Sequence, residues 1–91
     1  MDTYIATFYS HFGALRFKKA CDALGIPART MPVPRNLSSS CGTCTRFEAD
    51  AVPDYRAHED ELETIVRVVE GGYERVYAAE GSVFSDGKEG K

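Results

Sequence analysis

Two cysteines, Cys41 and Cys44, are separated by two residues and form the only close thiol pair of the 91-residue chain. A thiolate is the form of cysteine that attacks electrophiles, carries a transferable sulfur atom or binds a metal ion. A free thiol titrates at about 8.5, and nearby positive charge lowers this pKa. Arg35 and Arg46 flank the pair in the sequence. We therefore expect an accessible and activated thiol site at Cys41 and Cys44.

A serine-rich segment leads into this pair. Ser38, Ser39 and Ser40 directly precede Cys41, and Gly42 follows it. Hydroxyl and backbone N–H groups can donate hydrogen bonds to an anionic sulfur, and glycine allows a close backbone approach or a positive φ. The sequence thus predicts a sulfur-binding loop that consists of Ser38, Ser39, Ser40, Gly42, Arg35 and Arg46. The alternative is a loop that carries two inert thiols.

Metal binding and redox exchange are the other uses of such a pair. A structural zinc ion takes four ligands, of which Cys41 and Cys44 supply two. The remaining donors are Cys21, which we expect in the core, His58, which we expect half-exposed on a helix, and His11. Cys41 and Cys44 are therefore weak metal candidates that need a second chain. Thioredoxin-like dithiol exchange is less favoured, because the cysteine pair of thioredoxin-like proteins lies at the start of a helix, whereas Cys41 and Cys44 lie at the start of a predicted strand.

The flanking sequence predicts six elements that position the loop. They are a strand at Thr3–Phe8, a helix from a Ser10 cap to about Leu24, strands at Ile26–Val33 and Thr43–Glu48, a helix from Pro53 to Glu70, and a strand at Tyr73–Ala79. This order, βαββαβ, is typical of an α+β, ferredoxin-like fold with a four-stranded antiparallel sheet and two helices on one face. Prolines in the second strand place it at a sheet edge.

The alternation of the third strand decides where the thiols point. If Thr43, Thr45 and Phe47 face the helices, Cys44 and Arg46 face the open side of the sheet, and both thiols are at least partly accessible. The neighbouring first strand leaves two readings for His11, a polar residue at the helix start or a residue that approaches the sulfur loop. The acidic run 59–63 is expected to be a solvated helix face.

Composition and length limit the classes of protein. The chain fits a single domain at residues 1–80 with a disordered tail at 81–91. A net charge of −3 without a basic stripe disfavours nucleic-acid binding. No apolar run reaches the roughly 20 residues of a membrane span, and no signal peptide is evident at the N-terminus. An odd cysteine count is unlike a secreted disulfide framework, so we expect a cytoplasmic protein.

The chain resembles a small bacterial family of Se/S carrier-like proteins, a domain of unknown function. The resemblance covers most of residues 4 to 48. It rests on the strand with Phe8, on Ser10 and Ala14-Leu15, on Gly25-Ile26-Pro27, on Pro32-Val33-Pro34-Arg35, and above all on Leu37-Ser38-Ser39-Ser40-Cys41-Gly42 with Arg46. A Ser-Ser-Ser-Cys-Gly motif that enters a strand is the most specific part of this match.

The resemblance implies that Cys41 carries sulfur or selenium as a persulfide or selenylsulfide, without a cofactor. Donor and acceptor proteins are then the partners, and the chain is a carrier rather than a stand-alone enzyme. Cys44 departs from the family pattern, which leaves open whether it resolves a loaded Cys41, binds a metal or has no role. The alternative is a non-catalytic ferredoxin-like module that binds or dimerises through a Cys41/Cys44 redox switch or metal site.

Overall fold

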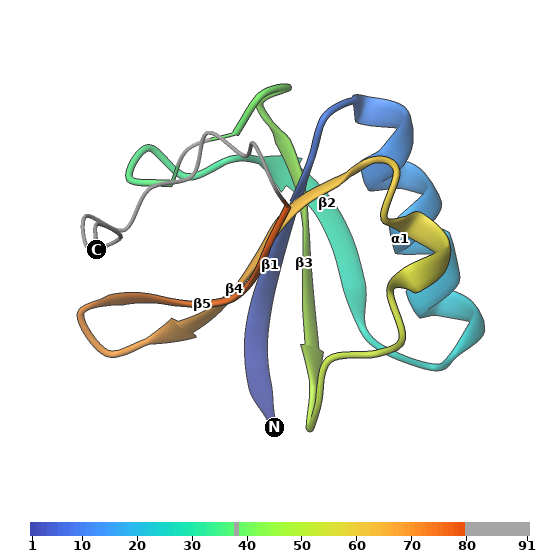
Figure 1. Ribbon diagram of the computed structural model, residues 1–91. Helices are drawn as coiled ribbons and strands as arrows, with labels where there is room; N and C mark the ends of the chain where they lie inside the picture. The colour runs from blue at the N-terminus through green and yellow to red at the C-terminus, as the bar shows by residue number, and fades with distance from the viewer. Residues whose placement is uncertain (38, 80–91) are drawn as a thin grey trace.

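A computed structural model describes residues 1–37 and 39–79 of the chain. Within this part the fold is α+β, with one α-helix and a five-stranded antiparallel sheet (Figure 1). Its elements are β1 (Asp2–Phe8), α1 (His11–Ala23), β2 (Ala28–Pro32), β3 (Thr43–Ala49), the 3₁₀ turn η1 (Arg56–His58), β4 (Leu62–Val69) and β5 (Gly72–Ala78). The α+β class is confirmed, whereas the four-stranded, two-helix ferredoxin-like arrangement is wrong.

The sheet has the strand order β2-β3-β1-β4-β5, and each neighbouring pair is antiparallel. β2 lies at an edge, as its prolines predicted, because a proline cannot donate to a ladder on both sides. The expected helix after Pro53 is absent from the described residues. In its place η1 leads into β4, which pairs with β1 and closes a hairpin with β5.

The sequence of β4 explains why this segment is a strand. Leu62, Ile65, Val66 and Val69 fit a helical stripe, but β4 is dominated by β-branched residues, namely Thr64, Ile65, Val66, Val68 and Val69. Such side chains lose rotamer freedom in a helix and pack well on a pleated surface. Gly71 has a φ of +87 in the tight turn that joins β4 to β5, so the glycine pair marks a hairpin rather than a helix end.

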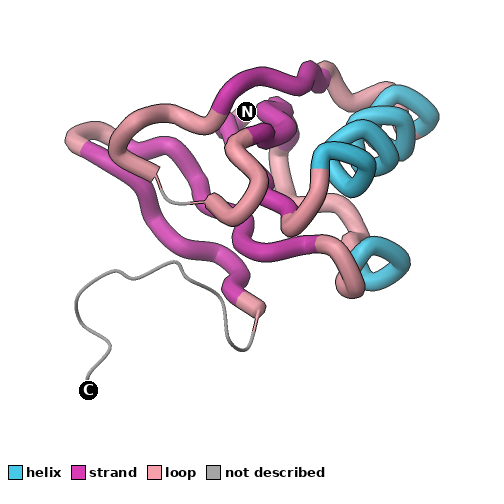
Figure 2. The backbone as a smooth tube through the Cα atoms, turned by 90° about the horizontal axis from the view of Figure 1, so that it is seen from above, coloured by secondary structure: helices cyan, strands magenta, loops and turns pink. Residues whose placement is uncertain are grey.

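Helix α1 covers one face of the sheet, which we call the helix face (Figure 2). Ser10 caps the helix as predicted, and its hydroxyl oxygen accepts a hydrogen bond from the Gly13 backbone N–H at 3.1 Å. Gly13, Ala14, Phe17 and Cys21 are the buried helix residues. They pack on apolar side chains of β1, β3 and β4, including Phe8, Phe47 and Ile65.

The opposite side, which we call the far face, is not fully open. The segment of residues 33–37 and 39–42, called the cysteine loop below, crosses this side of the sheet (Figure 1). Leu37 from the loop is buried in a second apolar cluster with Ile5, Cys44 and Val66. The expectation of a wholly open face is therefore wrong over this part of the sheet.

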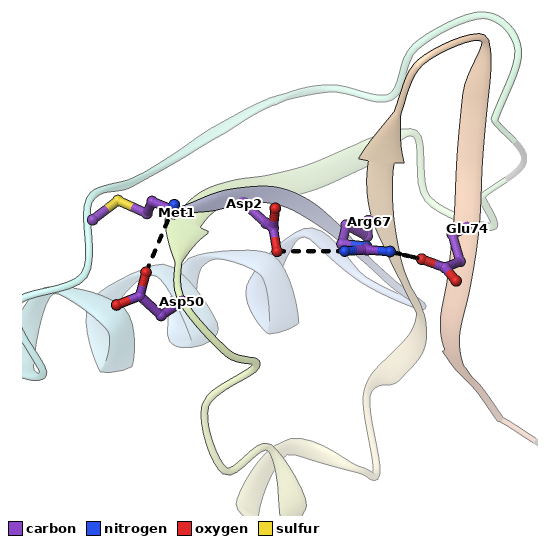
Figure 3. Close-up of polar contacts among 5 residues, drawn as sticks. All are labelled: Met1, Asp2, Asp50, Arg67 and Glu74. Carbon is purple, nitrogen blue, oxygen red and sulfur yellow. Dashed lines mark hydrogen bonds and ion pairs between the residues drawn. The ribbon is translucent and has the colours of Figure 1, made fainter.

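At the end of the sheet away from the cysteine loop, ion pairs join three strands to one another and link the residues that flank β1 and β3. Arg67 on β4 pairs with Asp2 on β1 and with Glu74 on β5, and the amino group of Met1 lies 3.7 Å from an Asp50 carboxylate oxygen just after β3 (Figure 3). Exposed pairs of this kind typically contribute about 0.2–1 kcal/mol each. They support the strand register and lie away from the thiols.

Two expectations concern residues that the structure does not describe. Ser38 of the predicted sulfur-binding loop and the tail at 81–91 both lie outside the described residues. Among the described residues, no helix is long and apolar enough to cross a membrane.

Candidate functional site

Cys41 lies in the cysteine loop directly before β3 and is half-buried. Its Sγ accepts a hydrogen bond from the Thr43 backbone N–H and donates one to the Thr43 carbonyl oxygen, both at 3.4 Å. Both contacts tie the sulfur to the first residue of β3. Gly42, between Cys41 and Thr43, has a φ of +80. Glycine adopts this left-handed conformation at little energetic cost, so it allows the tight turn that brings Thr43 back to the sulfur.

His11 approaches the same short segment from the helix side. It is the first residue of α1, and its Nδ1 lies 2.5 Å from Thr43 Oγ1. His11 thus fits both readings, because it is the first residue of the helix and also contacts Thr43, the first strand residue after the sulfur loop; β1 pairs with β3 and brings the helix start to this point. An exposed imidazole is thereby linked, through one threonine, to the backbone that faces Cys41.

Glu63, near the start of β4, binds the cysteine loop through two hydrogen bonds. One of its carboxylate oxygens accepts the Ser40 backbone N–H at 3.0 Å, and the other accepts the Ser40 hydroxyl at 2.9 Å. The assignment of the acidic run 59–63 to a helix face is wrong, because these residues form a turn and the start of β4, and Glu63 is 0% exposed rather than solvated. The β1–β4 register is interrupted here, because Thr7 pairs with Thr64 and Phe8 pairs with Leu62, which leaves Glu63 as the extra residue between them. Such a bulge changes the direction of a side chain near a strand end.

The hydrogen bonds of Ser39 and Ser40 differ from those that the sequence predicts for a sulfur-binding loop. Both donors of Ser40 are directed at Glu63 rather than at Cys41. Ser39 Oγ is buried and has no hydrogen-bond partner among residues 1–37 and 39–79. The backbone N–H of Thr43, which was not singled out in the sequence, is the donor that reaches the sulfur.

Cys44 faces away from α1, as the alternation predicted, but it is 0% exposed. The cysteine loop covers it with Leu37, and Met31, Val33 and Tyr73 pack around the same cluster. Burial, and after it the neighbouring Cys41 charge, raise the pKa of Cys44 to about 11. The expectation that both thiols are accessible is therefore wrong for Cys44, because the loop that directly precedes β3 folds back over this face of the strand.

Arg35 and Arg46, the two arginines of the predicted sulfur-binding loop, have other surroundings. Arg46 stands opposite Arg29 across β2 and β3, pairs with Glu48 at 3.8 Å, and lines a shallow hollow of about 220 Å³ with Arg29. Arg35 is exposed in the cysteine loop. In the described part of the chain, no hydrogen bond or ion pair joins either predicted arginine to Cys41. Their influence on the charge around the sulfur stays a prediction.

The remaining metal donors do not converge on the thiols. Cys21 is 1% exposed in the core against the sheet, as expected, and burial raises its pKa to about 11. His58 packs edge-on against Phe17 with ring centroids 5.3 Å apart, in η1 rather than in a helix. Burial, and after it the charge of Arg16, lower the pKa of His58. Within residues 1–37 and 39–79, no group of three or more metal-ligating side chains is found.

The arrangement therefore combines one reachable thiol with one covered thiol. Cys41 is presented at the surface by a glycine turn and a backbone N–H, while Cys44 lies beneath the same loop. Such a site suits nucleophilic or carrier chemistry at a single sulfur, without a deep cavity.

The comparisons with known proteins yield one match. The model of a family described as "Putative Se/S carrier protein-like" matches residues 3–77. This match covers all but the first residue of β1, everything from α1 to β4, and all but the last residue of β5. Neither the curated proteins nor the solved structures contain a match to the chain.

Proposed function

We propose, from the premise that this chain belongs to the Se/S carrier-like family, that Cys41 carries a sulfur or selenium atom between proteins. The observation that carries the proposal is the Cys41 thiol itself. It is half-buried, lies on a surface loop and accepts the Thr43 backbone N–H. A carrier needs such a thiol and a partner surface, but it needs no cavity, which suits a domain of this size.

The transfer is a thiol exchange. The Cys41 thiolate attacks the outer sulfur of a donor persulfide, so that a new S–S bond forms on Cys41. The donor S–S bond breaks, and the donor leaves as a thiolate with the bonding electron pair. No oxidant is consumed, because the persulfide is already at the oxidation level of a disulfide. Transfer of selenium gives a selenylsulfide by the same steps.

Neighbouring groups hold the sulfur in place for this exchange. The Thr43 N–H supports the anionic form of Cys41, and His11 restrains the Thr43 side chain from α1. Donor and acceptor proteins are the partners in this scheme, and no cofactor is required. All three cysteines are free thiols, which fits action in a reducing compartment such as the cytoplasm.

Loading with a small persulfide donor tests this function. After incubation with glutathione persulfide and removal of the excess, intact mass should show one added sulfur atom that cyanide removes. Cys41→Ser should lose the added sulfur, whereas Cys21→Ser, which alters a core thiol, should keep it. Equal loading of Cys41→Ser and the unaltered protein would contradict the proposal.

A second candidate function is a redox-switched binding module. Only Gly42 and Thr43 separate Cys41 from Cys44 in the sequence, and within the described residues β2 lies at a sheet edge that offers a side for association. If a Cys41–Cys44 disulfide controls association, light scattering should show a mass change between oxidised and reduced protein. Cys44→Ala should abolish this change, and an identical mass in both states would remove the switch.

A further inference from the structure

Cys41 and Cys44 are three positions apart in the sequence, but the cysteine loop leaves them with different exposure to solvent. Cys41 is reachable from solvent, and Cys44 is 0% exposed under the same loop. Two sets of side-chain contacts fasten the loop to the sheet. Ser40 binds Glu63 on β4, and the Tyr73 hydroxyl on β5 donates to Asn36 Oδ1 at 3.0 Å.

Loss of the Ser40–Glu63 contact should cost more free energy than loss of the Tyr73–Asn36 contact. A carboxylate that is removed from water is costly unless hydrogen bonds replace its hydration. Both oxygens of Glu63 receive a hydrogen bond from Ser40, one from the backbone and one from the side chain. Loss of this partner would leave a buried carboxylate unsatisfied, so the contact holds the residue that adjoins Cys41 against the sheet.

A second thiol near a persulfide can displace the sulfur atom that a carrier holds. When Cys41 carries a persulfide, the Cys44 thiolate can attack the inner sulfur, Cys41 Sγ. A Cys41–Cys44 disulfide then forms, the bond to the outer sulfur breaks, and that sulfur leaves as hydrosulfide with the electron pair. The proton of Cys44 goes to solvent or to the hydrosulfide. The step needs no oxidant, since the persulfide is already oxidised to this level.

We propose that the Ser40–Glu63 contact keeps the loop closed over Cys44, and that opening this contact turns the loaded carrier into a sulfide-releasing protein. The inference rests on the proposed function of Cys41. It assigns Glu63 as a positioning residue and Cys44 as a resolving thiol that is covered until the loop moves. A partner that displaces Ser40 from Glu63 would thereby trigger release of the cargo.

The chemistry of the covered thiol agrees with this assignment. Burial raises the pKa of Cys44 to about 11, so little thiolate is available while the loop is closed. The Cys44 Sγ faces the Pro32 carbonyl oxygen at 3.9 Å, an acceptor that favours the protonated thiol. Opening the loop removes the cover of Leu37 and lets water reach the sulfur.

The test compares sulfide release from loaded variants. Ser40→Ala removes the hydroxyl contact and keeps the backbone one, and Glu63→Gln keeps the side-chain volume. Each should release sulfide roughly tenfold faster than the unaltered protein, because a hydrogen bond to a charged group shifts an opening equilibrium by about that factor. Intact mass should show a disulfide with two hydrogens fewer. Glu74→Gln on β5 alters an exposed carboxylate and should leave the rate unchanged.

The double variant Ser40→Ala/Cys44→Ser decides the role of Cys44. It should retain its persulfide as long as the unaltered protein does, whereas loosened packing alone would let it lose sulfur as fast as Ser40→Ala. That second outcome, or an unchanged release rate in both single variants, overturns the inference.

A further measurement separates this inference from the proposed function. Alkylation of Cys44 in unloaded protein, with Cys21 as the internal buried reference, should be roughly tenfold faster in Ser40→Ala than in the unaltered chain. If no variant accepts sulfur at Cys41, the carrier function fails while this labelling still reports on the loop. If Cys44 labelling is the same in all variants, the contact does not hold the loop and the inference fails.

Discussion

The imidazole of His11 contacts the hydroxyl of Thr43, with Nδ1 and Oγ1 2.5 Å apart. The same threonine directs its backbone N–H at Cys41 Sγ. The helix start and the strand start are therefore joined at the residue that faces the sulfur. We expect this link to let the exposed histidine affect the reactivity of the thiol without direct contact between their side chains.

Removal of this link should slow the reaction of Cys41. In His11→Ala, Thr43 is less restrained and holds its N–H less firmly against the thiolate. We expect alkylation of Cys41 at neutral pH to slow about two- to tenfold, the range that corresponds to one hydrogen bond of about 0.5–1.5 kcal/mol. Thr43→Val keeps the backbone N–H and the branched side chain, and it should give a similar decrease.

A double-mutant cycle checks that the two residues act as one unit. His11→Ala/Thr43→Val should react no more slowly than either single variant, because the contact is already lost. Two independent, multiplying decreases would show that the contact between these side chains does not control the thiol.

Gly42→Ala tests the positive φ beside the sulfur. A Cβ on Gly42 meets nothing within 4 Å, so the cost of the change is conformational rather than steric. At a φ of +80 we expect a loss of about 1–2 kcal/mol in the free energy of unfolding, measured in urea. The altered turn should also change the alkylation rate of Cys41.

Gly25→Ala provides a matched control for this variant. Gly25 has a φ of +75 and equally open surroundings, but it lies after α1. It should lose similar stability and leave Cys41 reactivity unchanged. Equal effects of both variants on the thiol would indicate that global destabilisation, rather than the Gly42 turn, governs the reaction.

Gly13→Ala should destabilise the protein, although alanine is the better helix former. An added Cβ would lie 2.9 Å from the Glu61 Cβ and 3.3 Å from the Phe8 Cβ. Overpacking typically costs about 1–3 kcal/mol, more than the roughly 1 kcal/mol of helix propensity gained. Thermal unfolding should show a lower Tm, and Glu61→Gly should recover part of the loss in a double variant. A higher Tm for Gly13→Ala would contradict the close approach.

Local signals explain the elements that were predicted correctly. Ser10 identified the start of α1 because its side chain caps the helix within three residues. Pro27 and Pro32 identified an edge strand because the missing N–H is a property of the residue itself. The alternation in β3 likewise gave the face of Cys44. None of these inferences required knowledge of a distant partner.

Long-range contacts explain the errors. The apolar positions of β4 fit both a helix and a strand, and pairing with β1 and β5 decides between them. The partner of Ser40 is Glu63 on β4, far along the chain from the thiols. The cover over Cys44 comes from Leu37 in the preceding loop, and the local pattern does not show that this loop folds back onto the sheet. The run of β-branched residues from Thr64 was the available signal for β4, and it would have removed Glu63 from a helix face.

Two buried thiols should make the protein less stable at alkaline pH. Burial is the main cause that raises the pKa of both Cys21 and Cys44 from 9.0 to about 11. The folded protein therefore holds these thiol protons more tightly than the unfolded chain, and unfolding releases them. The resulting stability is fully present below 9.0 and is lost as the pH rises through about 11. Each thiol should contribute on the order of 2 kcal/mol to this loss.

Denaturant unfolding across this pH range measures the contribution of each thiol. Because lysines and tyrosines also titrate there, the comparison is between the pH slopes of variants rather than between absolute stabilities. Cys21→Ala and Cys44→Ala each create a small cavity that lowers stability at every pH, but each should flatten the alkaline slope. Cys41→Ala, at the half-buried thiol, provides the matched control for removal of a sulfur. If both buried-thiol variants keep the full slope, the protons of Cys21 and Cys44 are not the cause of the alkaline loss.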